Sequence, residues 1–358
     1  MRSEQAECAL PEKMPALVWC SQGLNLSELD IPAITLLTDV KVKIQMTGIC
    51  GTDLAVITGK EPGITGVIRG HEAVGTVIET GANVTGLKIG DRVVIDPNQS
   101  CGECRFCRQG KEHLCIGTDG QGMPIAGLNK NGTFAPWFVT DEKYLYKLPE
   151  QMSWEAALAV EPLACVLHNF REARISAGDS VLILGSGPMG LLCQIVAKRI
   201  GCTTISTEIN AGRLAKAKQI SDYACPPEEL TPELVSSILG EKKFNIVMDT
   251  VGTQMEMAEQ WVERGGTIIP FGINGKYQYT ISPTFYTQNA VRLLGAGEYL
   301  NTFADAFQFA KDVPEVSSLI TRKYSLNQSG TAIQELLGHV PDPAASSDKP
   351  LLKTVFVF

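Results

Sequence analysis

Strand and helix patterns alternate along residues 180–295, and this alternation constrains the fold more than any other feature of the chain. An Ala-rich helical segment from about Trp154 leads into it. Helix-period runs span 188–200 and 255–262, and apolar or β-branched runs span 180–184, 203–207, 244–249, 267–271 and 291–295. Strands separated by helices pair in parallel, with helices on both faces of the sheet. We therefore predict an α/β protein with a doubly wound parallel sheet of the Rossmann type.

The first predicted strand is followed at once by the glycine pattern Gly185-Ser-Gly-Pro-Met-Gly190. Gly185 would permit a tight turn, Gly187 would let backbone N–H groups approach a pyrophosphate, and Gly190 would let the helix pack closely on the strand. The position between a strand and a helix makes an otherwise weak pattern specific. We predict that this loop, including Pro188 and Met189, binds a dinucleotide.

Glu208 follows the next predicted strand, 18 residues after Gly190. An acidic side chain at this point can accept hydrogen bonds from the ribose hydroxyls and repels a 2′-phosphate, which favours NAD over NADP. Arg213, five residues later, is a second candidate cofactor contact because it could help bind a phosphate. The charge of Glu208 opposes that role, and a solvated helix residue is the alternative for Arg213.

Residues 1–150 show a different pattern, dense in glycine and proline with short β-branched runs between turn signals. The predicted strands span 41–46, 73–79, 91–96 and 134–140. Residues after about Gly297 contain one helical run and a strand-like end at 351–358, and we expect them to rejoin this region. The polar segment 341–350 is expected to be a surface loop. A chain of 358 residues exceeds the roughly 250–300 at which a single core stops growing, so we expect two domains.

Four cysteines form a C-x2-C-x2-C-x7-C cluster, namely Cys101, Cys104, Cys107 and Cys115. Four thiolates fill every tetrahedral position of a zinc ion and leave none for a substrate. The chain has 11 cysteines, an odd number, and the tight spacing fits a metal in a reducing compartment better than a disulfide framework. The cluster therefore predicts a structural zinc site.

A second set of metal donors lies outside that cluster: Cys50, His71, Glu72 and Glu161. One thiolate, one imidazole and one or two carboxylates can leave a zinc position open. They also leave Zn²⁺ less electron-rich than a second thiolate would, so it stays a strong Lewis acid toward a hydroxyl. Taken singly, His71 could be a buried histidine, Cys50 a small apolar side chain and Glu161 a charge at a helix start. Their joint occurrence favours a catalytic site.

Two neighbours of Cys50 complete this hypothesis. Asp53 could accept a hydrogen bond from the free N–H of His71 and so fix its tautomer. Thr52 could accept the proton of an alcohol and pass it on. Glu72 could alternate between a metal ligand and a supporting role.

Cys50-Gly-Thr-Asp53, Gly70-His-Glu72, the four-cysteine cluster and Val160-Glu-Pro-Leu163 together resemble the zinc-dependent medium-chain alcohol/polyol dehydrogenase family. The resemblance covers essentially the whole chain. It implies a GroES-like, strand-rich catalytic domain at residues 1–158 and 297–358, and a Rossmann nucleotide-binding domain at 159–296. It also implies that Cys50 and His71 bind the catalytic zinc. Glu161 stands where alcohol-specific members carry a second cysteine, as in the sorbitol dehydrogenase-like branch.

The chain departs from the family pattern at two positions. Ala55 occupies a place where members often carry the histidine that ends a proton relay. Tyr299 matches the polyol-specific members, but Glu298 replaces the arginine that precedes it there. Glu298 and Tyr299 are the candidate substrate residues, and the acidic Glu298 could meet an ammonium group.

These patterns predict an oxidoreductase with two Zn²⁺ per chain that transfers a hydride from a secondary alcohol or polyol to NAD. Two alternatives stay open, an amino-alcohol oxidant of the threonine 3-dehydrogenase type and a catalytically inactive nucleotide-binding relative. The net charge of −8 and the absence of any Lys/Arg run longer than a pair argue against nucleic acid or an anionic membrane as partner.

The same sequence carries predictions about location and assembly. The N-terminus lacks the apolar core of a signal peptide, and no stretch reaches the ~18 apolar residues of a membrane span, so we expect a cytoplasmic protein. The apolar run 291–295 would form the open edge of the parallel sheet. Pairing that edge with a second copy would cover it, and we expect a homodimer or homotetramer.

Overall fold

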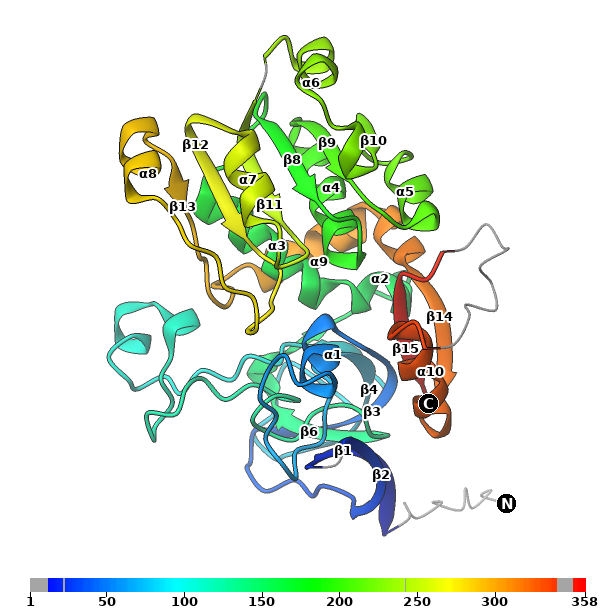
Figure 1. Cartoon of the computed structure of the whole chain (residues 1–358). Coiled ribbons are helices and arrows are strands. Elements are labelled where there is room, and N and C mark those ends of the chain that lie inside the picture. Colours follow the sequence, from blue (N-terminus) through cyan, green and yellow to red (C-terminus); the bar gives the residue numbers. More distant parts are fainter. Residues whose placement is uncertain (1–11, 22, 242, 340–349) are drawn as a thin grey trace, which may run out of the picture.

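The computed structural model describes residues 12–21, 23–241, 243–339 and 350–358, and two large sheets organise them (Figure 1). The upper sheet in Figure 1 is fully parallel and six-stranded, in the order β10-β9-β8-β11-β12-β13. Its strands are β8 (Ser180–Leu184), β9 (Thr203–Thr207), β10 (Tyr223–Cys225), β11 (Phe244–Asp249), β12 (Val262–Pro270) and β13 (Arg292–Leu293). This order is that of the doubly wound Rossmann sheet and confirms the predicted fold class.

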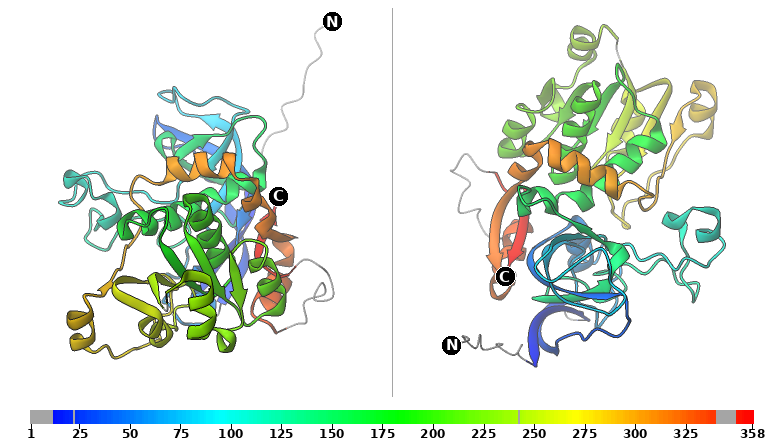
Figure 2. Two further views of the ribbon diagram at one scale, coloured as in Figure 1. Left: turned by 90° about the horizontal axis from the view of Figure 1, so that it is seen from above. Right: turned by 180° about the vertical axis from the view of Figure 1, so that it is seen from behind.

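Side chains of the central strand β8 alternate between two apolar cores. Val181 and Ile183 pack in a core with helices α3 (Val160–Ala173) and α4 (Pro188–Ile200). Leu182 and Leu184 pack in the other core, which contains residues of α6 (Pro232–Leu239) and α7 (Met255–Trp261). Strand side chains point alternately to opposite faces, so the two cores show that helices cover both faces of this sheet, as Figure 2 also shows.

The lower sheet is mostly antiparallel and seven-stranded. Its order is β14-β15-β3-β4-β5-β7, and β6 pairs with β3. The strands are β3 (Asp39–Gly48), β4 (Glu72–Thr80), β5 (Arg92–Ile95), β6 (Trp137–Asp141), β7 (Leu145–Lys147), β14 (Ile320–Ser325) and β15 (Lys353–Val357). A separate antiparallel pair consists of β1 (Lys13–Cys20) and β2 (Gly23–Asp30).

The last strand returns the end of the chain to the first region, because β15 pairs with β3. The expected return of the residues after 297 is thus confirmed. Strands of the lower sheet come from residues 39–147 and 320–357, and those of the parallel sheet from 180–293. The domain boundaries at 158 and 297 themselves stay predictions.

Short helices connect these strands. Besides α3 and α4 they are α1 (Gly51–Ile57), α2 (Trp154–Leu158), α5 (Ala211–Ala217), α6 (Pro232–Leu239), α7 (Met255–Trp261), α8 (Pro283–Asn289), α9 (Phe303–Asp312) and α10 (Ser329–Leu336). Within the described ranges, none of them combines the length and apolarity needed to cross a bilayer.

The structure corrects the prediction for the C-terminal region, where one helical run was expected and both α9 and α10 are present. The second helix is short and starts with Ser-Gly-Thr, residues of low helix propensity, so its signal is weak. Strand β14 was missed because it lies at the sheet edge, half exposed and without apolar alternation. At the other sheet, β13 has only two residues of the five expected. The loop expected at 341–350 lies outside the described residues except for Pro350.

Candidate metal and dinucleotide site

Cys50 stands at the N-cap of α1, and Asp53 in the first turn of that helix holds it in place. One Asp53 oxygen accepts a hydrogen bond from the Cys50 N–H at 3.0 Å, and the other pairs with the Arg69 guanidinium at 3.0–3.1 Å. Asp53 and Arg69 are both buried. Asp53 thus binds Cys50 and Arg69, and its expected hydrogen bond from His71 stays a prediction.

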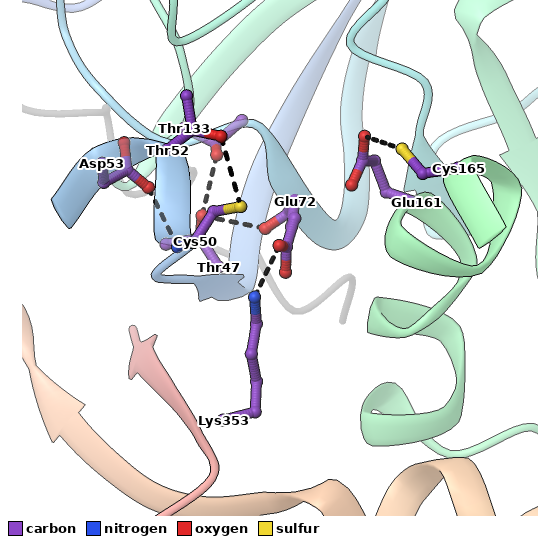
Figure 3. Close-up of polar contacts among 9 residues, drawn as sticks. All are labelled: Thr47, Cys50, Thr52, Asp53, Glu72, Thr133, Glu161, Cys165 and Lys353. Carbon is purple, nitrogen blue, oxygen red and sulfur yellow. Dashed lines mark hydrogen bonds and ion pairs between the residues drawn. The ribbon is translucent and has the colours of Figure 1, made fainter. Parts of the chain in front are cut away.

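Cys50, His71 and Glu72 bring one donor atom each to within 4.8 Å of the others, although they come from two separate segments. Figure 3 shows Cys50 and Glu72 of this group. His71 is buried, and its Nδ1 has no hydrogen-bond partner in the described chain. Burial alone would lower the pKa of His71, but the Cys50 thiolate, aided by Asp53 and Glu161, raises it to about 10. A buried imidazole that anions surround and that keeps a free nitrogen fits a metal cation.

Glu72 is fully buried at the start of β4 and is held by Lys353 from β15. The Lys353 Nζ donates to Glu72 Oε1 at 2.5 Å, while Oε2 has no partner. Burial would lower the pKa of Lys353, but Glu72 and Cys50 raise it. Sequence analysis missed Lys353, and no signal marked it, because it is a single lysine 281 residues from its partner.

Glu161 comes from α3, and in Figure 3 Glu72 lies between it and Cys50. It is buried and accepts a hydrogen bond from the Cys165 thiol at 3.9 Å. Burial raises the pKa of Glu161 to about 8, against the influence of His71. The compact donor group contains Glu72 and does not contain Glu161. Glu161 as a direct ligand thus stays a prediction.

Two further positions frame the proton path. The Thr52 hydroxyl lies 3.7 Å from the Cys50 sulfur and is half-buried, so it borders the donor group. Ala55 is buried within α1, and a small packed methyl group thus fills the position of the absent relay histidine.

The four-cysteine cluster lies in a loop that projects from the body of the molecule (Figures 1 and 2). The sulfur atoms of Cys101, Cys104, Cys107 and Cys115 all lie within 4.8 Å of one another. Backbone N–H groups of residues 101, 104 and 117 point at these sulfur atoms at 3.3 Å. Such donors lower the pKa of Cys104 to about 6, whereas burial and its neighbours raise that of Cys107 to about 12. Four thiolates in this space need a cation, and the ten described cysteines form no disulfide.

The glycine loop joins β8 to α4 as predicted, and its glycines have distinct roles. Gly185 has a φ of +93°, which favours glycine, and a Cβ on Gly190 would come within 2.1 Å of the Gly185 oxygen. Gly187 caps α4 and faces open space, apart from one Arg213 nitrogen 3.9 Å from where a Cβ would lie. Pro188 and Met189 form the first turn of the helix. The loop thus leaves the helix N-terminus free for an anion.

Glu208 supports this loop from the end of β9. Its two carboxylate oxygens accept hydrogen bonds from the N–H groups of Ser186 and Asn210, each at 2.8 Å. Arg213 is half-buried, and its Nε donates to the Leu351 oxygen at 3.2 Å. Arg213 thus contacts the C-terminal segment, which neither of its two expected roles, a solvated helix residue or a cofactor contact, had included.

Tyr299 is buried, and its hydroxyl donates to Asp96 Oδ1 at 2.7 Å. Asp96 thus accepts the hydrogen bond that the Tyr299 hydroxyl could otherwise donate to a substrate. Glu298, its neighbour, is half-buried. The expectation of a substrate role therefore rests more on Glu298 than on Tyr299.

Known proteins resemble the chain along most of its length. The family profiles "Alcohol dehydrogenase GroES-like domain" and "Zinc-binding dehydrogenase" match residues 37–150 and 188–312. Sorbitol dehydrogenase of Bacillus subtilis (strain 168) is 27% identical over 92% of this chain and 95% of its own. D-xylulose reductase A of Aspergillus oryzae is 32% identical over 74% and 77%. The crystal structure of 2R,3R-butanediol dehydrogenase from Bacillus subtilis superposes with a TM-score of 0.80, at 25% identity, over 96% and 99%.

Proposed function

We propose, from the premise that this chain belongs to the zinc-dependent medium-chain alcohol and polyol dehydrogenase family, that it oxidises a secondary alcohol or polyol with NAD. Zinc is a cofactor of this family, and similar solved structures hold a nicotinamide dinucleotide. One observation carries the proposal. A mostly apolar pocket is lined both by Glu72, one of the metal donors, and by Pro188 and Met189 at the start of the helix that follows the glycine loop, so the two predicted sites border one cavity. The intact donor set argues against an inactive relative.

Cys50, His71 and Glu72 would hold the catalytic zinc, with Glu161 as a further carboxylate beside it. When bound, this Lewis acid lowers the pKa of the substrate hydroxyl. Thr52 borders the donor group and would take the proton, and Asp53 fixes the loop that carries Cys50. Lys353 orients Glu72 by holding one oxygen and leaving the other free. A dinucleotide whose pyrophosphate lay at the N-terminus of α4 would supply the hydride acceptor.

The four-cysteine cluster would hold a second zinc with no open position. It lies in the projecting loop, so we assign it a structural role. This division gives about two zinc ions per chain, one of each kind.

A substrate panel tests the function. Purified enzyme should reduce NAD with secondary alcohols or polyols, and a chelator that strips the catalytic zinc should abolish the absorbance change at 340 nm. NAD reduction that persists in metal-free protein, or no reduction with any secondary alcohol, contradicts the proposal.

Cofactor preference is a separate proposal. Glu208 is buried beside the glycine loop, and a 2′-phosphate next to it would add a second negative charge there. We expect a higher kcat/KM with NAD than with NADP. Glu208→Ser together with a new neighbouring arginine should narrow or invert the ratio. A wild-type preference for NADP would sink this proposal.

Assembly and location are proposals as well. We propose a homodimer or homotetramer, supported by β13 at the sheet edge with Leu293 half exposed on it. Sedimentation at micromolar concentration tests it, and a strict monomer contradicts it. We also propose a cytoplasmic location, supported by the unpaired state of the ten described cysteines.

A further inference from the structure

The loop from residue 296 to 302 is fastened to the rest of the protein on both sides of Glu298. On one side the Ala296 oxygen lies 3.1 Å from His168 Nε2. On the other, Arg171 donates to the Leu300 oxygen at 3.0 Å, and Tyr299 donates to Asp96. The backbone that carries Glu298 is therefore held in place from both sides.

These anchors place Glu298 beside the metal donors. Asp96 directly follows Ile95 of β5, which pairs with Ala73 of β4, and His71 and Glu72 directly precede Ala73. The Tyr299–Asp96 hydrogen bond therefore fixes the loop against the end of the sheet that carries the donors. The electrostatic neighbours agree, because His71 is the charged group that acts most on Glu298.

Of the described glutamates in this space, only Glu72 has a cation in a salt bridge. Glu298 has the neutral Asn98 side chain as its hydrogen-bond partner and His71 as its charged neighbour. Glu72 pairs with Lys353, and Glu161 has the Cys165 thiol and His71 beside it. No Lys, Arg or His of the described chain comes within 4.0 Å of the Glu298 carboxylate. Burial raises the pKa of Glu298, and Glu298 in turn raises that of Glu161. A half-buried carboxylate without a salt bridge gains from a cation that binds next to it.

We propose that Glu298 binds an ammonium group of the substrate, so that the protein acts on a secondary alcohol or polyol that carries a protonated amine near the hydroxyl. This inference rests on the proposed function and narrows its substrate class. The hydroxyl would lie at the donor group of Cys50, His71 and Glu72, and the ammonium would lie toward the 296–302 loop. Phosphorylated polyols would place an anion beside Glu298 and would be poor substrates.

Two matched substrate pairs test this. 1-Amino-2-propanol and 1,2-propanediol have the same carbon skeleton, but the first carries an ammonium group where the second carries a hydroxyl. 4-Amino-2-butanol and 1,3-butanediol differ in the same way and are one carbon longer. The wild type should show the higher kcat/KM for the amine in at least one pair. Glu298→Gln keeps the shape and removes the charge, and should reduce the amine-to-diol ratio on the order of tenfold or more, mainly through KM of the amine.

Two more variants complete the design. Glu298→Lys should abolish the amine preference, and the exposed Glu228→Gln is the matched control that should leave the ratio unchanged. Zinc content and melting temperature of each variant report whether the fold is intact. An amine-to-diol ratio below one in both pairs, or a ratio that Glu298→Gln leaves unchanged, overturns the inference while the proposed function stands. No NADH from any of the four alcohols contradicts the proposed function itself.

Discussion

The two metal-donor groups of this protein are built in opposite ways. The four-cysteine cluster uses four identical donors from one loop of 15 residues, and backbone N–H groups of the same loop support its sulfur atoms. The group around His71 uses three different donors, and its support comes from Asp53 on α1 and from Lys353 on the last strand. The first group comes from one short segment and offers four ligands, enough to fill a tetrahedral zinc. The second comes from separate segments and offers three, which would leave one position for a substrate.

The difference has a functional consequence. A local site with four thiolates can stabilise its own loop without affecting the rest of the molecule. A distributed site depends on the packing of several elements, so its geometry can be adjusted by residues that never touch the metal. The comparison predicts that substitutions in the two groups affect turnover and stability differently.

The largest expected effect on turnover comes from His71→Ala. The substitution removes the imidazole that would bind the catalytic zinc. Bound zinc lowers the activation free energy by several kcal/mol, so kcat/KM should fall on the order of a thousandfold or more. Zinc content should fall from about two to about one per chain. The exposed His339→Ala is the control. Full activity of His71→Ala would contradict the claim that the group around His71 is the catalytic site.

Lys353→Met should have the largest effect on stability in the open site. It leaves Glu72 buried without its cation, which costs about 3–5 kcal/mol in the free energy of unfolding. Bound zinc replaces part of the lost charge, so the loss should be larger in metal-free than in zinc-loaded protein, as urea unfolding would show. Lys323→Met breaks the more exposed pair with Glu155 and should cost at most about 1 kcal/mol. Equal losses for both lysines would contradict the account.

Glu72→Gln and Glu161→Gln sharpen the ligand assignment. Because Glu72 belongs to the compact donor group, its amide variant should weaken zinc binding on the order of 10–100-fold and lower turnover. Glu161→Gln should have the smaller effect, and the double variant should empty the site. Zinc titration of the three variants decides this, and a larger loss in Glu161→Gln would make Glu161 the ligand.

Cys104→Ser should change turnover least. It should release the zinc of the projecting loop and lower the melting temperature, while turnover per molecule with an intact catalytic site stays within a few-fold. Cys20→Ser, outside both groups, should keep both metals. Loss of activity with full metal content and unchanged melting would show that the cluster is not a separate structural site.

The parallel sheet could be predicted closely from the sequence because its signals are local. Residues 180–184, 188–200, 203–207 and 244–249 carry apolar or helical periodicity and form β8, α4, β9 and β11 with the same bounds. Strand β14 is half exposed at an edge, so burial leaves no mark on its residues. The four cysteines were recognisable because they are closely spaced, whereas Cys50, His71 and Glu72 were recognisable because they occur together in motifs that resemble those of a known family.

Their supports were not recognisable. The contacts of Asp53 with Arg69 and of Glu72 with Lys353 depend on which strands become neighbours, and a single charged residue carries no periodicity. The pairing of Asp53 with Arg69 was missed for this reason, since the sequence does not show that Arg69 lies within reach. The sequence also did not show that Glu72 would lie closer to Cys50 and His71 than Glu161 does.

Anomalous X-ray diffraction at the zinc edge tests the central claim most directly, because it locates each metal without any variant. The account predicts two peaks per chain. One should lie at bonding distance from Cys50 Sγ, a His71 nitrogen and a Glu72 oxygen, and the other among the four sulfur atoms of the projecting loop. A single peak confined to the four-cysteine cluster would contradict the account.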